Sequence, residues 1–304
     1  MKVLIIIVTY NGSKFIKDCL HSINFSIVFT DILIVDNCSN DRTLEIIKGD
    51  YPNVKLICNS KNLGFGKANN IGIEYAINNN YEYVFFLNQD TILEPNTIEK
   101  LLDQANKSKD FGFISPLHLS WSGDALEPVF EYFLRKSGPK NLLSKFFFRN
   151  ESCVEIGFVN AAAWLIPVNT LRKIGGFNPI FPHYCEDIDY YNRLKFFGYK
   201  NYLILDSKIR HYSTGSISIS KDWNKKVIRE IFETIAKLTN INSSFFYNFI
   251  FVSFTSFKNS LIYLLKWKLK EFYFEVIVWL KVLTFLFEVI STRKHSKKGS
   301  AFLK

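Results

Sequence analysis

The chain has 304 residues, of which 48% are hydrophobic and 22% charged, and it carries a formal net charge of +10. This composition excludes a disordered chain, and the length suffices for one large α/β domain with an appendage or for two modest domains. The positive charge indicates an anionic partner, which leaves a nucleotide, a nucleic acid or a membrane surface open.

The first 115 residues alternate between predicted strands and predicted helices. Short apolar runs predict strands over residues 3–8, 32–35, 54–58 and 83–87. Helical patterns lie between and after them, over residues 13–26, 41–48, 67–78 and 95–107. This alternation predicts an α/β fold with a mostly parallel sheet covered on both faces, in which ligands bind at the carboxyl ends of the strands.

The alternation stops over residues 120–150, where we predict either a flap over the site or a plain surface insertion. Beyond it we predict a strand over residues 157–167, short and longer helices over 168–174 and 185–197, and a strand over 202–205. A basic helix is predicted over residues 221–239, and long helices rich in Phe, Tyr, Trp and Lys follow it.

Polar residues gather where the predicted strands end. Thr9, Tyr10 and Asn11 follow the first strand, Asp36 and Asn37 the second, and Asn88, Gln89 and Asp90 the fourth; Asn62, Gly64, Gly66, Lys67 and Asn70 open the third helix. An acid after the second strand suits a hydrogen bond to a base or ribose, or alternatively the capping of a turn. The two-glycine turn allows backbone N–H groups to approach an anion.

Together these segments resemble the nucleotide-sugar half of the GT-A fold, family 2 glycosyltransferases. The segments FVNAAAWLIP (158–167), GGFN (175–178) and HYCEDIDY (183–190) resemble the acceptor side of that family, and HYSTGS (211–216) resembles its histidine loop. The resemblance covers about residues 3–216 and is greatest to bacterial rhamnosyltransferases of surface polysaccharide assembly. It implies a catalytic domain over 1–220, with a nucleotide-sugar half (1–115) and an acceptor half (150–220), before a helical region over 221–304.

The resemblance implies an inverting transfer of a sugar, with rhamnose favoured, from a dTDP- or UDP-linked donor to a hydroxyl of a glycan or lipid-linked glycan. The residues expected to bind the donor are Thr9, Tyr10, Asn11, Asp36, Asn37, Asn62, Gly64, Gly66, Lys67, Asn70, Asn88 and Gln89. A non-catalytic nucleotide-sugar-binding scaffold on the same fold is the alternative. A nucleic-acid binder is suggested by the charge alone, and no motif of such proteins is present.

The resemblance also implies a divalent metal ion at Asp90, the last acid of a DxD-like motif, and at His211. One carboxylate with one imidazole suits Mn²⁺ better than Mg²⁺. Asn88 and Gln89 occupy the other two positions of the motif, so the site has one acid where a full motif has two. A turn residue and a structural histidine are the alternatives for these two positions.

By the same resemblance, Asp187 is the expected general base, and Glu186 orients the acceptor or the backbone. A position near a helix start is expected to keep Asp187 ionised, with a pKa near or below ~4. A single base without a nucleophilic carboxylate suggests one displacement. Trp164 and Tyr184 are candidate acceptor platforms, with core packing as the alternative for Trp164. Arg193 is predicted on a solvated helix face, with a phosphate contact as the alternative.

The residues from 241 onward include ten Lys or Arg and three Glu, and hence +7 of the +10 net charge. Lysines beside Phe, Trp and Tyr suit a helix that lies in a lipid interface, so we expect peripheral attachment to the inner face of the plasma membrane. A homodimer interface or a helical cap is the alternative. Five scattered cysteines without a CxxC pair favour reduced thiols and a cytoplasmic location.

Overall fold

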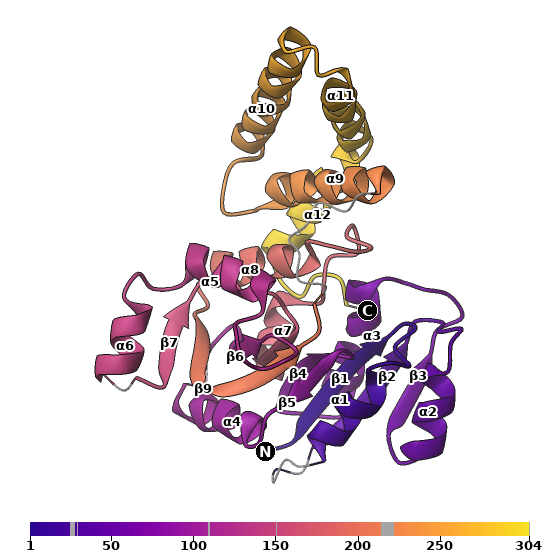
Figure 1. Cartoon of the computed structure of the whole chain (residues 1–304), viewed down its shortest axis with the longest axis vertical. Helices are drawn as coiled ribbons and strands as arrows, with labels where there is room; N and C mark the ends of the chain where they lie inside the picture. Colours follow the sequence, from indigo (N-terminus) through magenta and orange to yellow (C-terminus); the bar gives the residue numbers. More distant parts are fainter. Residues whose placement is uncertain (25–27, 29, 109, 150, 214–221, 304) are drawn as a thin grey trace.

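Figure 1 shows a computed structural model of the chain, which describes all residues except 25–27, 29, 109, 150, 214–221 and 304. The strands of the described part are β1 (Val3–Thr9), β2 (Asp31–Asp36), β3 (Lys55–Cys58), β4 (Tyr83–Asn88), β5 (Thr91–Leu93), β6 (Ile114–Leu119), β7 (Cys153–Ile156), β8 (Ala163–Pro167) and β9 (Asn201–His211). They form one sheet in the order β3-β2-β1-β4-β8-β6-β9-β5, and β7 pairs with β9. β1 pairs in parallel with β2 and β4, whereas β8 runs antiparallel to β4, so the sheet is mixed but mostly parallel.

Helices cover both faces of this sheet. Leu4 and Ile6 of β1 belong to one apolar cluster, whereas Ile5 and Ile7 belong to the other, as alternation along a strand requires. The first face is covered by α3 (Phe65–Asn78), α5 (Pro128–Ser137), α7 (Val168–Ile174) and α8 (Glu186–Phe196), and the second by α1 (Ile16–Ile23), α2 (Thr43–Asp50) and α4 (Thr97–Lys107). Burial on both faces explains why the central strands are continuous apolar runs.

The C-terminal region is helical and rests on the sheet domain through α9 (Trp223–Thr239). α10 (Phe245–Leu265) and α11 (Leu269–Thr284) form a hairpin that projects away from the sheet, and α12 (Leu286–Lys298) returns toward it (Figure 1). Arg293 of α12 donates hydrogen bonds to the carbonyl oxygens of Leu238 and Ser243, at 2.8 and 2.6 Å. Within the described residues, no helix has the length and apolar character needed to span a bilayer.

The strands and helices predicted within the first 107 residues are confirmed, although residues 25 and 26 of the first predicted helix lie outside the described part. A single strand over residues 157–167 is wrong, because β8 begins only at Ala163. The segment 120–150 contains two helices, α5 and α6 (Leu142–Arg149), and α5 packs on the core through Phe130 and Leu134. The strand predicted over 202–205 is the middle of the longer β9, which carries His211 at its end.

Candidate active site

Asp36 lies at the carboxyl end of β2 and organises the loop that follows. Its carboxylate accepts hydrogen bonds from Thr9 Oγ1 at 2.8 Å and from the backbone N–H and Oγ of Ser39 at 2.9 and 2.6 Å. The side chain is fully buried. These bonds fix the β2 loop against the end of β1, so Asp36 shapes the surface that a ligand meets at this edge.

Tyr10 and Gln89 join the ends of β1 and β4. The backbone N–H of Tyr10 donates to Gln89 Oε1, and Gln89 Nε2 donates back to the Tyr10 carbonyl oxygen, each at 3.1 Å. Asn11 has a left-handed φ of 47°, and its Oδ1 accepts from the backbone N–H of Asn40 at 2.9 Å. The Tyr10 ring remains exposed at this edge, where an aromatic face suits stacking on a planar ligand.

The loop before α3 is held by two asparagines. Asn37 Nδ2 donates to the Gly64 carbonyl oxygen at 3.1 Å, and Asn62 Oδ1 accepts from the Gly64 N–H at 2.8 Å. Gly64 has a φ of +84°, and a Cβ atom on it would lie 2.0 Å from the carbonyl oxygen of Pro182. Glycine is therefore required at this position, and the loop touches the segment that leads into α8.

The first turns of α3 contain the other three residues predicted to bind the donor. Lys67 is exposed, and Gly66 is buried so close to α8 that its added Cβ would lie 3.6 Å from Glu186 Cβ. The amide of Asn70 is used by the backbone of Phe177: Nδ2 donates to its carbonyl oxygen at 2.9 Å, and Oδ1 accepts from its N–H at 2.6 Å. Contrary to expectation, the Asn70 amide is thus occupied in joining α3 to the GGFN turn.

Asp90 and His211, the expected metal ligands, lie side by side. Thr91 of β5 pairs with His211 of β9, so His211 Nε2 comes to 3.5 Å from Asp90 Oδ1. Two ligand atoms each about 2.1 Å from one ion lie at most ~4.2 Å apart, so these atoms are close enough to share a cation. His211 Nδ1 and Asn88 Oδ1 are buried without a hydrogen-bond partner in the described part of the chain.

The residues therefore fit a divalent ion, and an oxygen with a nitrogen is a donor set that Mn²⁺ accepts. Within the described residues there is no group of three or more His, Cys, Asp or Glu side chains that could hold a metal. Residues 214–216 of the predicted histidine loop lie outside the described part.

Two strained residues set the direction of α8. Tyr184 and Cys185 have φ values of 71° and 68°, a conformation that costs on the order of 1–3 kcal/mol per residue and persists only where the surroundings impose it. Asp187, in the first turn, accepts hydrogen bonds from the Ile188 N–H at 2.8 Å and from the Ala161 N–H at 3.4 Å. The sequence in front of α8 thus orients the Glu-Asp pair.

The electrostatics of this pair correct one expectation. Burial raises the pKa of Asp187 to about 6, although backbone N–H groups act in the opposite direction. A pKa near or below 4 was therefore wrong, because desolvation outweighs the helix dipole. Burial and the Asp187 charge raise the pKa of Glu186 to about 8, and Glu186 Oε2 has no partner among the described residues. The two carboxyls titrate as a coupled pair, and the higher pKa lies on the side of Glu186, where the Asp187 charge adds to burial.

A short loop before β8 joins Asp187 to the edge that carries the metal-ligand pair. The Ala161 N–H binds Asp187, and the carbonyl oxygen of the adjacent Ala162 accepts from the Asn88 N–H at 2.9 Å. Together with the close approach of α3 to α8, where a Cβ added at Gly66 would lie 3.6 Å from Glu186 Cβ, this places the Glu-Asp pair beside the ends of β1, β2 and β4. The structure thus brings together groups that are far apart in the sequence.

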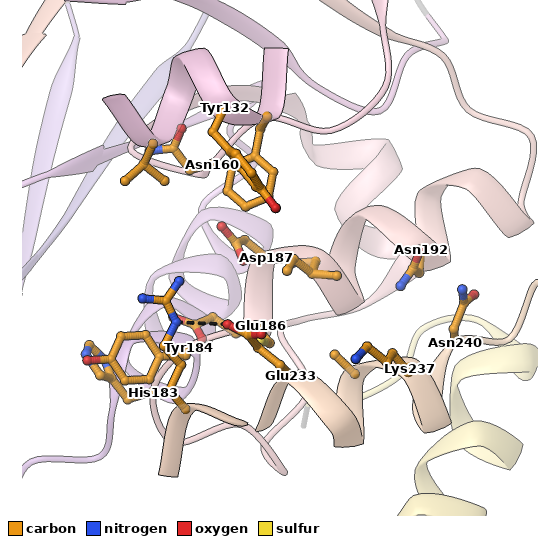
Figure 2. Close-up of a pocket in the computed structure, with 16 residues that line it drawn as sticks. Tyr132, Asn160, His183, Tyr184, Glu186, Asp187, Asn192, Glu233, Lys237 and Asn240 are labelled. Atoms are coloured by element: carbon orange, nitrogen blue, oxygen red, sulfur yellow. Dashed lines mark hydrogen bonds and ion pairs between the residues drawn. The ribbon is translucent and has the colours of Figure 1, made fainter. Parts of the chain in front are cut away.

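Asp187 faces a cavity of about 670 Å³ between α5, α8 and α9 (Figure 2). Tyr184 and Glu186, which were predicted at the acceptor site, also line it. Sequence reasoning missed the contribution of α9, which is Arg229, Glu233, Ala236 and Lys237, and that of Asn240, which follows the helix. The feature of the sequence that points to this contribution is the basic character of the helix predicted over residues 221–239. The expected domain boundary places this helix in the C-terminal region and not at the site.

Two other residues have different surroundings from those expected. Trp164 is fully buried on β8 and stacks on Phe113 with ring centroids 4.2 Å apart, so it is a core residue and does not line the cavity. Arg193 is not on a solvated helix face: it is buried and forms an ion pair with Asp189 at 2.9 Å. Its guanidinium also donates to the carbonyl oxygens of Ile174 and Gly176.

One edge of the sheet thus offers a polar ledge with the neighbouring Asp90 carboxylate and His211 ring, and beside it a carboxylate, Asp187, that faces a separate cavity. Transfer of a group from an activated donor to an acceptor hydroxyl needs one place for the donor and another for the acceptor. This arrangement, together with the sheet topology, is that of a sugar-nucleotide-dependent transferase of the GT-A fold. A family model described as Glycosyl transferase family 2 matches residues 4–156. The chain belongs to glycosyl transferase family 2, and it is a glycosyltransferase.

Three of the proteins to which the chain is similar share 25% of its residues or fewer over the aligned lengths. N-acetylglucosaminyl-diphospho-decaprenol L-rhamnosyltransferase of Mycobacterium tuberculosis is 25% identical over 234 residues, which are 70% of this chain and 76% of that protein. Residues 1–349 of S. aureus TarS in complex with UDP superpose with a TM-score of 0.56 at 16% identity, covering 82% of this chain and 68% of that one. The mannosyltransferase PcManGT of Pyrobaculum calidifontis, in complex with GDP-Man and Mn²⁺, gives a TM-score of 0.58 at 15% identity and covers 80% and 65%.

Proposed function

We propose that this glycosyltransferase moves rhamnose from a dTDP- or UDP-linked donor to a hydroxyl of a lipid-linked glycan, with inversion, in the synthesis of a bacterial surface polysaccharide. The observation that carries the proposal is the position of Asp187, which faces the cavity while it is bonded to the loop that holds Asn88. The mycobacterial relative, named a rhamnosyltransferase acting on a diphospho-decaprenol-linked sugar, supports the choice of rhamnose and of a lipid-linked acceptor.

The donor is proposed to lie along the ends of β1, β2 and β4. The exposed Tyr10 ring suits the base, and the loop shaped by Asp36 suits the ribose. The first turn of α3, with Lys67, presents positive charge and N–H groups to the diphosphate. The full set comprises Thr9, Tyr10, Asn11, Asp36, Asn37, Asn62, Gly64, Gly66, Lys67, Asn88 and Gln89.

Asp90 and His211 are proposed to hold a divalent ion, Mn²⁺ in preference to Mg²⁺. When bound, such an ion neutralises the departing diphosphate as a Lewis acid. The 3.5 Å between Asp90 Oδ1 and His211 Nε2 supports this assignment. The remaining ligands of the ion are expected to come from the diphosphate oxygens and water.

Asp187 is proposed to accept the proton of the acceptor hydroxyl. As that oxygen bonds to the anomeric carbon, the bond from this carbon to the diphosphate breaks on the opposite face, and its electron pair leaves with the nucleoside diphosphate. A pKa of about 6 makes Asp187 a stronger base than an ordinary aspartate while it stays largely ionised at pH 7. Protonated Glu186 can then orient the acceptor without repelling it.

The proposal is tested by turnover of a panel of nucleotide sugars by the wild type and by Asp187→Asn and His211→Ala. We expect turnover of dTDP-rhamnose that requires Mn²⁺ and stops with EDTA. Asp187→Asn should still bind UDP or dTDP but turn the donor over about 10²- to 10⁴-fold more slowly. A wild type that binds nucleotide sugars and turns none over would instead be the scaffold alternative, and the proposed function would be rejected.

Residues 221–304 are proposed to attach the enzyme to the inner face of the plasma membrane through the α10–α11 hairpin. Trp267, at its tip, is 84% exposed and is flanked by Lys266 and Lys268. Other exposed large apolar side chains of the hairpin are Phe246, Tyr247, Ile250, Phe251, Phe254, Phe257, Leu261, Leu264, Leu265, Leu269, Tyr273 and Leu280. Aromatic residues between lysines suit a lipid interface, and anionic head groups attract the lysines.

Flotation with phosphatidylglycerol vesicles tests the attachment. We expect Trp267→Ser to float less than the wild type, because the hairpin tip loses its interfacial anchor. Phe148→Ser is the matched control, since Phe148 is 85% exposed but lies on α6. If a homodimer covers the hairpin instead, the wild type will elute as a dimer and fail to float, and the attachment proposal is then wrong.

A further inference from the structure

The wall that α9 contributes to the cavity carries an exposed lysine, Lys237, whose charge acts on Glu230 of the same helix without forming an ion pair within the described residues. Arg229 is compensated there, because its Nε lies 2.8 Å from Glu233 Oε1 in an ion pair. Lys237 lines the same cavity, and it forms no ion pair with any acid of the described chain. Its positive charge is therefore available to a ligand in the cavity.

The other titratable groups of the cavity leave few charges at neutral pH. Glu186 keeps its proton because burial and the neighbouring carboxylate raise its pKa to about 8. Burial lowers the pKa of His183, so its ring is neutral. With the Arg229–Glu233 pair compensated, the charges that face the cavity are the Asp187 carboxylate and the Lys237 ammonium.

Two asparagines line the cavity near Lys237. Asn192 and Asn240 lie near it at one end of the cavity in Figure 2. Asn242 connects them, because its Nδ2 donates to the Asn192 carbonyl oxygen at 2.8 Å and to Asn240 Oδ1 at 3.0 Å. Since Asn240 Oδ1 is used in this way, its Nδ2 is left as a donor. An ammonium beside amide donors suits the oxygens of a phosphate group.

The same turn of α9 is bonded to the start of the hairpin. Asn248 of α10 donates to the Lys237 carbonyl oxygen at 2.8 Å. The phosphate-compatible end of the cavity therefore adjoins the element proposed to meet the membrane. A lipid-linked sugar has its phosphate between the lipid and the sugar, and this order matches the order of the hairpin, Lys237 and Asp187.

We propose that Lys237, with Asn192 and Asn240, binds the phosphate or diphosphate group that links the acceptor sugar to its lipid carrier. This inference rests on the proposed function, because it assumes that the acceptor hydroxyl lies at Asp187. The sugar then occupies the middle of the cavity, whose volume of about 670 Å³ lies within the ~300–1,000 Å³ usual for small-molecule sites. Lys237 is thus a specificity-determining residue for the acceptor and has no part in donor binding.

The test compares the dissociation constants of two probes: N-acetylglucosaminyl-diphospho-farnesol and the farnesyl N-acetylglucosaminide that lacks the diphosphate. We expect Lys237→Ala to weaken the binding of the first probe about tenfold, as the loss of a charged hydrogen bond predicts, and to leave the second unchanged. Lys225→Ala is the matched control, because Lys225 is exposed on α9 but does not line the cavity. Neither variant should change the affinity for UDP with Mn²⁺.

Equal affinities of wild type and Lys237→Ala for the diphosphate probe, or no binding of that probe to the wild type, would overturn the inference. An equal weakening of both probes would also overturn it, since the effect would not depend on phosphate. A loss of UDP affinity would place Lys237 at the donor instead. Failure of the proposed function is distinguishable from failure of this inference. In that case the wild type does not turn the donor over, whereas the binding of the diphosphate probe still depends on Lys237.

Discussion

Asp187→Asn is expected to lower activity and raise stability at the same time. Burial raises the pKa of this carboxyl from 3.8 to about 6. At about 1.4 kcal/mol per pH unit, the ionised group lowers the free energy of unfolding by up to about 3 kcal/mol at neutral pH. The sign follows from linkage: between pH ~4 and ~6 only the folded state holds the proton, so stability falls as the pH rises through this window.

Asparagine removes the charge and keeps most of the contacts. Its Oδ1 can still accept a hydrogen bond from the Ile188 N–H, which in the wild type donates to Asp187 Oδ1 at 2.8 Å. The longer bond from the Ala161 N–H to Asp187 Oδ2, at 3.4 Å, is lost. We therefore expect the variant to gain about 1–3 kcal/mol in urea unfolding at pH 7.5 and nothing below about pH 3, where the wild-type carboxyl is neutral in both states. Turnover should fall about 10²- to 10⁴-fold, the usual contribution of a general base.

The pH dependence of the wild type gives an independent check. With a pKa of about 6, the ionised fraction of Asp187, and with it kcat/KM, should fall about tenfold between pH 7 and pH 5. Glu186→Gln is the control, because glutamine mimics the protonated glutamate and should leave this midpoint in place. A variant Asp187→Asn that is both inactive and less stable would show that the carboxylate is structural, and one that keeps its activity would exclude it as the base.

Three further outcomes are expected. Asp90→Asn should abolish the Mn²⁺-dependent thermal stabilisation by UDP, and an unchanged shift would remove Asp90 from the metal site. Asp189→Asn should cost about 3–5 kcal/mol in urea unfolding, because it leaves buried Arg193 without its counter-ion; a loss below about 1 kcal/mol, as for a surface pair, would contradict this. Gly64→Ala should weaken UDP binding, because the added Cβ meets Pro182, and wild-type affinity would show that this loop does not contact the donor.

The donor half could be predicted from the sequence because its information is local. The apolar runs of β1, β2 and β4 are buried on both faces, so they stand out as strands. The residues at the strand ends then share an edge by topology alone. The 3.5 Å approach of Asp90 and His211 depends on β5, three residues long, which pairs with the end of β9; such a short pairing leaves little trace in the sequence.

The acceptor half was harder to predict because its properties depend on what covers it. Trp164 could not be assigned to a cavity or a core before the direction of its side chain on β8 was known, and it packs in the apolar cluster under α3, α5, α7 and α8. The pKa of Asp187 depends on burial, which no motif records. Arg193 was predictable, since Asp189 lies four residues before it on one helix face.

The expected boundary at residue 220 does not enclose all the residues that line the cavity. Asp187 comes before this boundary, and Arg229, Glu233 and Lys237 of α9 come after it, yet all four line one cavity. α9 also packs on the segment before α8 and is bonded to α10. Attachment to a membrane and selection of a lipid-linked acceptor would then reside in one continuous stretch, so changes in the hairpin should alter the KM for a lipid-linked acceptor and leave the KM for the donor unchanged.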